Sequence, residues 1–197
     1  MSANFEVMAA LFDYDSLAVR TPQINARGAK TAAVQAAEGK KAILNLGSKC
    51  QPTVSPFGAT CFQSDTEQTR RTIEFNITPE QNEQWQQFDA WAVDYFAENS
   101  EMLFKKSMSP SQVRECYRSP VTRHEGYAPH LRCKINVNQA RAWDADGKRI
   151  ELPELKQISC VPRITLQHAW FMSREWGFVL QVNDIQVLAS SEECPFE

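Results

Sequence analysis

The feature that most constrains the fold of this chain is a change of period near its middle, from alternating to helical and back again. Residues 70–77 alternate, with Ile73 and Phe75 on one side and polar residues on the other, which predicts a strand. Over residues 85–96 the large apolar residues recur every three or four positions, which predicts an amphipathic helix of about twenty residues. Alternation resumes after Pro129. Few helices within many short strands predict a mainly β fold.

Two Ser/Thr–Pro pairs mark the expected helix starts. Thr78 and Ser109 are N-caps, each followed by a proline at the first helical position, and Pro120 ends the second, shorter helix. The helical insert is therefore expected at about residues 79–118. Apart from residues 70–77, strands are expected within 16–38 (one or two at an edge) and over 40–46, 130–137, 158–161, 163–172 and 176–188. The segment 47–60 is expected to be a loop, and the last two strands a hairpin.

The length of 197 residues fits one domain. We expect a single domain over residues 1–189 and an acidic C-terminal tail over 190–197. An OB-fold-like β-barrel, with one long and one short helix between strands, accounts for this order of elements. A β-sandwich with a helical insertion fits the pattern almost as well.

The sequence also bears on where the protein works. No apolar run approaches the ~18–20 residues of a membrane helix, and no basic segment precedes the apolar N-terminal patch. The six cysteines are scattered and form no CxxC pair, which indicates a reducing compartment. We therefore expect an intracellular protein that is not secreted and has no membrane partner.

Charge is distributed unevenly along the chain. The formal net charge is −3, but residues 103–174 hold 13 basic and 6 acidic residues, a net of +7. Residues 1–102 hold 8 basic and 13 acidic residues, and residues 175–197 hold no Lys or Arg and 5 acidic residues, so each end has a net of −5. A basic middle suits a polyanionic partner, although basic residues that only solvate a surface would give the same pattern.

Single-strand binders combine cations that follow the phosphates with aromatic faces on which bases stack. Alternation over 130–137 places Arg132 and Lys134 on one face, about 7 Å apart at ~3.3–3.4 Å per residue. The candidate phosphate contacts are Lys105, Lys106, Arg132, Lys134, Arg163 and Arg174. The candidate stacking residues are Trp143, Phe57 and one of the neighbours Trp170 and Phe171, which must point to opposite faces of a strand. Trp85, Phe88 and Trp91 are assigned to the core.

The acidic tail contains Glu192, Glu193 and Phe196. Such a segment can dock on basic partners, or occupy the protein's own basic groove, although a solvated chain end has the same composition.

Catalytic and metal sites are not expected. Cys116, His124, His130 and Cys133 lack the tightly paired spacing of structural zinc modules. The sequence contains no nucleophile elbow, no phosphate-binding glycine loop and no H-E-x-x-H motif. We therefore expect a protein that is not an enzyme and needs no metal or other cofactor.

Three stretches resemble a known family. They are the loop 50–58 ending in Pro56-Phe57-Gly58, the segment from 104 to 135, and the terminal hairpin from 169 to 187. In their order and spacing the chain resembles the single-stranded DNA-binding proteins of large eukaryotic DNA viruses, which are distantly similar to podophage-type single-strand binders. The resemblance implies an OB fold and no cofactor. It also implies binding of single-stranded DNA without strong sequence preference, in DNA replication, recombination or repair. The expected location is then the nucleus or a cytoplasmic replication site, and replication proteins are the expected partners of the acidic tail. Podophage-type tails end in an aromatic residue, whereas here Glu197 follows Phe196.

The favoured hypothesis is therefore a sequence-nonspecific single-stranded DNA-binding protein. The alternative is a structural or assembly protein, such as a virion or scaffold component, with a β-barrel and no nucleic-acid role. A homo-oligomer is compatible with both.

Overall fold

A computed structural model describes residues 10–61 and 69–188 of the 197-residue chain. The helices are α1 (Pro79–Glu98), α2 (Ser100–Phe104) and α3 (Pro110–Cys116), with short 3-10 turns at Tyr14–Ser16 and Ala37–Gly39. The strands are β1 (Ala18–Val19), β2 (Gln23–Ile24), β3 (Lys30–Gln35), β4 (Ala42–Asn45), β5 (Thr53–Ser55), β6 (Ala59–Thr60), β7 (Arg70–Asn76), β8 (Tyr117–Arg118), β9 (Val121–Thr122), β10 (His130–Asn136), β11 (Arg141–Trp143), β12 (Arg149–Ile150), β13 (Ile158–Phe171) and β14 (Trp176–Val187). The chain is mainly β with a helical insert, as its periods predict.

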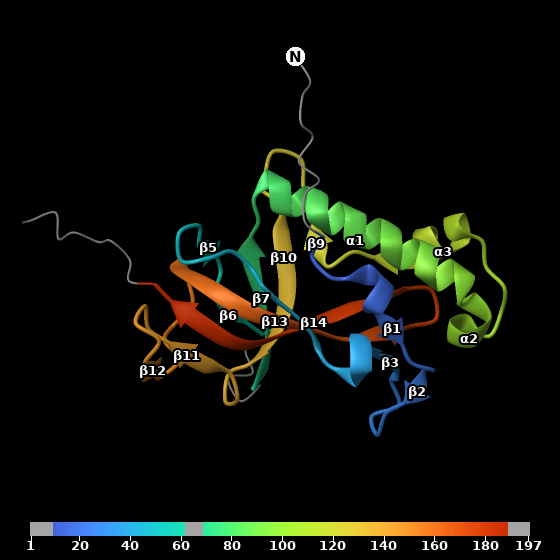
Figure 1. Ribbon diagram of the computed structural model, residues 1–197, viewed down its shortest axis with the longest axis horizontal. Coiled ribbons are helices and arrows are strands. Elements are labelled where there is room, and N and C mark those ends of the chain that lie inside the picture. Colours follow the sequence, from blue (N-terminus) through green and yellow to red (C-terminus); the bar gives the residue numbers. More distant parts are fainter. Residues whose placement is uncertain (1–9, 62–68, 189–197) are drawn as a thin grey trace, which may run out of the picture.

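The long hairpin of β13 and β14 is the central element of the fold (Figure 1). One edge of β13 pairs in turn with β3, β4 and β5, and the far edge of β14 pairs with β8, β10 and β11. β10 then pairs with β7, and the Thr53 hydroxyl of β5 donates to the Asn76 carbonyl of β7. This contact brings β7 back to β5, so the strands form a partly closed, OB-fold-like barrel.

Two strand predictions were wrong in detail. The expected strands 158–161 and 163–172 are one strand, β13, that continues through Pro162. The Pro162 carbonyl accepts from the Leu46 amide (2.9 Å) on the edge where β5 ends and β4 begins, so the missing proline N–H costs no bond of the ladder. The expected loop 47–60 contains β5 and β6, because that segment closes the barrel.

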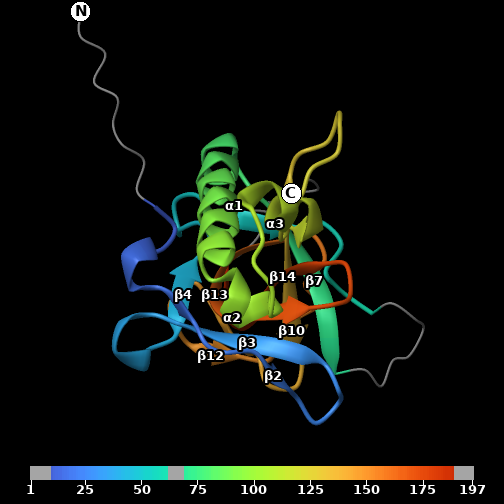
Figure 2. The same cartoon turned by 90° about the vertical axis from the view of Figure 1, so that its right-hand side faces the viewer.

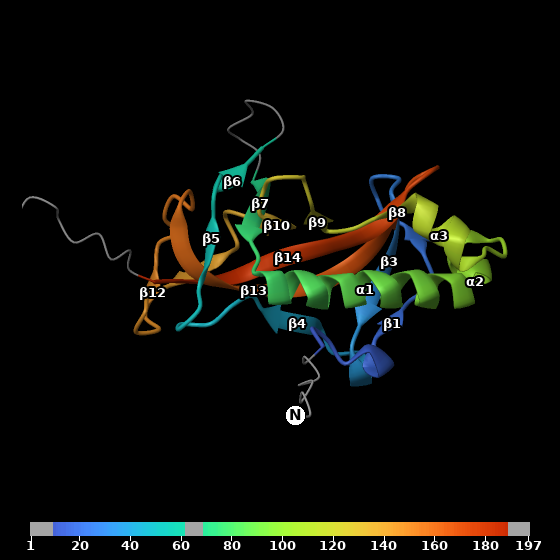
Figure 3. The ribbon, with the colours of Figure 1, turned by 90° about the horizontal axis from the view of Figure 1, so that it is seen from above.

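The helices cover one face of the hairpin (Figures 2 and 3). Both predicted helix starts are confirmed, since Thr78 and Ser109 each form a capping box, whereas the five-residue α2 was not expected. Trp85 and Phe88 are fully buried, as predicted, whereas Trp91 is only partly buried. Within the described ranges, no helix has the length and apolar character needed to cross a membrane.

Asp89 of α1 connects the helix to the segment that follows α3. Its carboxylate accepts hydrogen bonds from the hydroxyls of Tyr117 (2.8 Å) and Ser119 (2.8 Å) and lies 3.4 Å from the Arg123 guanidinium. Burial raises the pKa of Asp89 above its usual value, even though these hydrogen bonds and Arg123 act in the opposite direction. Ionisation of this carboxyl therefore costs the folded state some stability.

We expect Asp89→Asn to change the pH dependence of stability. Because the folded-state pKa lies above the unfolded value of about 3.9, the wild type loses stability as pH rises from that value through the folded pKa. The variant cannot ionise, so relative to the wild type it gains free energy of unfolding between about pH 4 and pH 7. Urea denaturation at both pH values tests this, with Asp94→Asn, an exposed residue of the same helix, as the control. Identical pH profiles for Asp89→Asn and wild type would contradict it.

Candidate nucleic-acid interface

The outward face of the barrel carries a polar, positively charged hollow. It has a volume of about 620 Å³ and lies where β4, β13, β14, β10 and β7 run side by side. Alternate residues of these strands point outward because their neighbours in sequence fill the core. We call this hollow the basic groove, which is lined by Lys41, Ile43, Arg70, Asn136, Gln139, Ala140, Arg141, Arg163, Thr165, Gln167, Gln181, Val182, Asn183 and Asp184.

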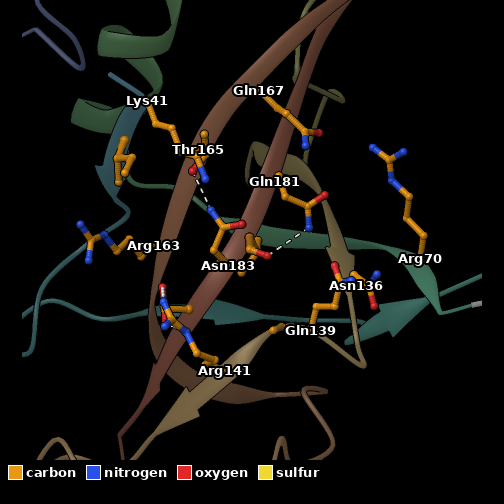
Figure 4. A pocket seen from close by; sticks show the side chains of 14 residues that line it. Lys41, Arg70, Asn136, Gln139, Arg141, Arg163, Thr165, Gln167, Gln181 and Asn183 are labelled. Carbon is orange, nitrogen blue, oxygen red and sulfur yellow. Dashed lines mark hydrogen bonds and ion pairs between the residues drawn. The ribbon is translucent and has the colours of Figure 1, made fainter. Parts of the chain in front are cut away.

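Cations stand around the basic groove and amides lie across its floor (Figure 4). Lys41 and Arg163 stand on one side, and Arg70 stands on the other. From β4 to β7 there are four strand spacings, about 19 Å at ~4.8 Å each. All three side chains are exposed, and none forms an ion pair with a residue in the described ranges. They are therefore free to meet an anion from solvent.

The fourth cation of the groove, Arg141, is already engaged. Its guanidinium pairs with Asp184 (Nε to Oδ1, 2.7 Å), and the other partner of that carboxylate is the Trp143 Nε1 (3.1 Å). Burial alone would raise the pKa of Asp184, but the hydrogen bonds of Arg141 and Trp143, with the charges of Arg141 and Arg163, bring it below its usual value. Asp184 is thus ionised at neutral pH. Four cations against one carboxylate leave the groove at +3.

The floor of the basic groove offers hydrogen bonds rather than rings. The Asn183 amide donates to the Thr165 hydroxyl (2.6 Å), and the Gln181 amide donates to the Val182 carbonyl (3.1 Å), so both side chains are held in place. The side chains of Gln139 and Gln167 are exposed and form no hydrogen bond within the described part of the chain. They remain available to a bound molecule.

Trp143 lies beside the basic groove and contacts Asp184 of its lining, but does not itself line it. Its indole is half-buried, is fixed by the bond to Asp184, and lies 6.0 Å from the Arg141 guanidinium, measured to the ring centroid. Its predicted role as a stacking residue is compatible with this position.

Arg132 and Lys134, two of the predicted phosphate contacts, each have a partner on the neighbouring strand. Antiparallel pairing of β10 with β7 sets Arg132 opposite Glu74 and Lys134 opposite Thr72. Arg132 forms an ion pair with Glu74 (3.0 Å), although 62% of its side chain stays exposed. The Lys134 ammonium donates to the Thr72 hydroxyl (2.8 Å), and burial, with Arg132 and Arg70 nearby, lowers its pKa. Neither is the free cation that the strand pattern suggested.

Phe57 lies in the tight connection between β5 and β6, beyond the far end of β10. Its ring is 56% exposed, as predicted for an aromatic residue in a proline-bounded loop, and it meets His130 edge-on with centroids 5.9 Å apart. Gly58 beside it has φ +69°, and a Cβ there would lie 2.9 Å from the Lys156 amide nitrogen. Only glycine fits this approach, which keeps the Phe57 loop close to the barrel.

The other predicted residues form a separate group around the β13–β14 turn. A second cavity of about 710 Å³ there is lined by Lys106, Trp170, Phe171 and Arg174, among others. Lys105 is exposed just after α2, at φ 63°. Phe171 is only 9% exposed, and its ring lies among Phe96 and Phe104, so it offers no face for stacking. Of the neighbouring pair, Trp170 is the accessible one.

The predicted tail residues Glu192, Glu193 and Phe196 lie outside the described residues. Within the described ranges, no group of three or more His, Cys, Asp or Glu side chains is arranged to hold a metal ion.

Comparison with known proteins gives similarity to solved structures only. No family model matches the chain, and no curated protein matches it. The chain is similar to gp2.5, a single-stranded DNA-binding protein encoded by bacteriophage T7, at 14% identity and TM-score 0.46, over 76% of this chain and 88% of that one.

A second similar structure is the single-stranded DNA-binding protein from bacteriophage Enc34. The C-terminal truncation matches at 7% identity and TM-score 0.46, over 90% of this chain and 98% of that one. The same phage protein in complex with single-stranded DNA matches at 9% identity and TM-score 0.44, over 91% and 96%. The function of this chain must be inferred from its own residues, chiefly those of the basic groove.

Sequence reasoning missed three groove cations, Lys41, Arg70 and Arg141. Two of them belong to doublets, Lys40-Lys41 and Arg70-Arg71, at the start of predicted strands. A doublet there puts one charge on each face of the strand, so one of the two is bound to lie on the outward face. The doublets can be seen in the sequence. The arrangement that brings the strands carrying these cations together cannot.

Proposed function

We propose that this protein binds single-stranded DNA, without strong sequence preference, in the basic groove. The observation that carries the proposal is the set of three unpaired cations, Lys41, Arg70 and Arg163, around an amide-lined sheet face. Such a face can neutralise phosphates along a strand whose bases are unpaired. Trp143 beside the groove supplies a ring on which a base can stack, worth ~1–3 kcal/mol.

The amide floor suits an unpaired strand better than a duplex. Gln139 and Gln167 present donors and acceptors to base edges, which a duplex already uses in its own pairs. Because a flexible amide can donate or accept, it meets each of the four bases with comparable bonds. The proposal of weak sequence preference follows from this adaptability together with the phosphate contacts.

We further propose the setting in which this binding acts. The three stretches that resemble the proteins of large eukaryotic DNA viruses support membership of that family and a non-enzymatic role in DNA replication, recombination or repair, inside the cell. The acidic segment 190–197 would then contact replication proteins.

A titration with labelled oligothymidine, a duplex of equal length and an RNA of equal length, at two salt concentrations, tests the proposal. We expect binding to the single DNA strand at low salt, with log K falling by ~0.7 per neutralised phosphate as log salt rises. Quenching of Trp143 fluorescence on binding, lost in Trp143→Phe, would locate the strand at the groove. Equal affinity for the duplex, affinity insensitive to salt, or no mobility shift at all would reject the proposal and favour the structural or assembly protein.

A further inference from the structure

The outward face that forms the basic groove continues along the hairpin to its turn. Inward residues of β13 are Ile164, Leu166, Ala169 and Phe171, all buried. The register shift between Leu166 and His168 adds one residue to the outward side, so Gln167 and Trp170 share the outward face with Arg163. Trp170 therefore lies on the same sheet surface as the groove, seven residues from Arg163, about 23 Å at ~3.3 Å per residue.

A glycine in the neighbouring strand leaves room for the Trp170 indole. A Cβ at Gly177 would lie 3.0 Å from Cζ2 and 3.2 Å from Cε2 of Trp170, and 2.7 Å from the Arg118 carbonyl. The ring thus rests against bare backbone at Gly177, and Trp170 stays partly exposed. This arrangement gives an aromatic platform fixed to a rigid strand.

The surroundings of this platform are positively charged. Lys30, Lys106 and Arg174 line the cavity beside Trp170, against one carboxylate, Glu175, which leaves +2. Glu175 is engaged by Arg118 (2.6 Å), and the Lys30 ammonium donates to the Leu103 carbonyl (2.8 Å). Lys106 and Arg174 are exposed and form no ion pair within residues 10–61 and 69–188. We call Lys106, Trp170 and Arg174 the tip site.

We propose that the tip site is a second contact for the strand held in the basic groove, reached only by strands longer than the groove can hold. A base stacks on Trp170, while phosphates meet Lys106 and Arg174. This inference rests on the proposed function of the groove. Continuity with the groove on one sheet face, and a positive charge of the same kind, favour a polynucleotide over a protein partner.

Oligonucleotide length separates the two sites. We compare a short oligothymidine of about 4 nucleotides with a long one of about 30, because one OB fold holds ~4–16 nucleotides. A long strand offers the groove more positions at which to bind. We expect the wild type to bind the long strand more tightly than this statistical factor alone predicts. In Lys106→Gln/Arg174→Gln the salt slope for the long strand falls by ~1.4, from two lost phosphate contacts at ~0.7 each. Its affinity falls by roughly 60-fold at 0.05 M salt. Affinity for the short strand stays unchanged.

Two further variants complete the test. Trp170→Leu should show the same length-dependent loss of affinity. The control, Lys40→Gln/Lys156→Gln, removes two exposed charges from outside both sites and should leave the affinity for both strands unchanged. The Lys106→Gln/Arg174→Gln variant changes no packed residue, so it reports on binding even where Trp170→Leu fails to fold. If the tip variants affect both lengths equally, or neither, the tip site is overturned while the groove proposal stands. If the wild type binds neither strand, both proposals fail.

Discussion

Replacing Lys41, Arg70 and Arg163 together with glutamine is expected to lower affinity for a short single strand by several hundredfold at 0.05 M salt. Each free cation neutralises one phosphate, and a slope of ~0.7 makes that contact worth ~8-fold at 0.05 M relative to 1 M salt. Three contacts multiply to roughly 500-fold, and the salt slope falls by ~2. The fold should be unaffected because all three side chains are exposed.

A control of equal charge makes this result specific to the basic groove. Arg20, Lys40 and Lys156 are also exposed, line neither the groove nor the tip cavity, and lose the same three charges when replaced with glutamine. Lys40 is the sequence neighbour of Lys41 and forms an exposed ion pair with Glu38 (2.6 Å) away from the groove. Fluorescence anisotropy at several salt concentrations measures both slopes. A control triple variant that loses as much affinity as the groove variant would show that only the overall charge matters.

Phe96→Ala is expected to cost the largest amount of stability, about 3–5 kcal/mol. The Phe96 ring is fully buried and stacks on Trp176 at 3.9 Å between centroids, with Phe171 and Phe178 as further neighbours. Removing it leaves a cavity between α1 and the hairpin, where the insert is held to the barrel, in addition to the lost transfer energy. Urea denaturation followed by circular dichroism gives the change in free energy of unfolding.

The same variant tests whether packing and binding are separate. Phe96 lies on the inward side of the hairpin and the basic groove on its outward side, so a folded Phe96 variant should bind the short strand as the wild type does. Phe96→Leu, which keeps most of the buried volume, is the better protein for this measurement and should lose less stability than Phe96→Ala. A loss below about 1 kcal/mol for Phe96→Ala would mean that the aromatic cluster does not hold the insert.

Much of the architecture is readable from local patterns. The period change at residues 70–96, the N-caps at Thr78 and Ser109, and the final hairpin each depend on residues close together in sequence, and the structure has each of them. The segment 47–60 was misread because its two strands are too short for alternation to show. β5 forms because it pairs with β13, more than a hundred residues later in the chain, and β6 forms because it pairs with β7.

The site was less predictable because a shared face depends on register. Lys41, Arg163 and Arg70 meet only when β4, β13, β14, β10 and β7 are placed side by side, and no local pattern contains that order. The register of β10 against β7 likewise gave Arg132 its partner Glu74 and Lys134 its partner Thr72. Composition located the basic half of the chain, but only the pairing of strands shows which charges remain free.

The position of the β13–β14 hairpin at the end of the described sequence has a consequence for protein synthesis. β13 and β14 are the last strands of the described chain, yet β3, β4, β5, β8, β10 and β11 all pair with them. The earlier strands therefore leave the ribosome before the partners that cover their edges, and the barrel closes only after Val187 has been translated. Until then the nascent chain exposes unpaired strand edges, and the apolar face of α1 lacks Trp176 and Phe178 of β14, on which Phe96 and Phe88 pack.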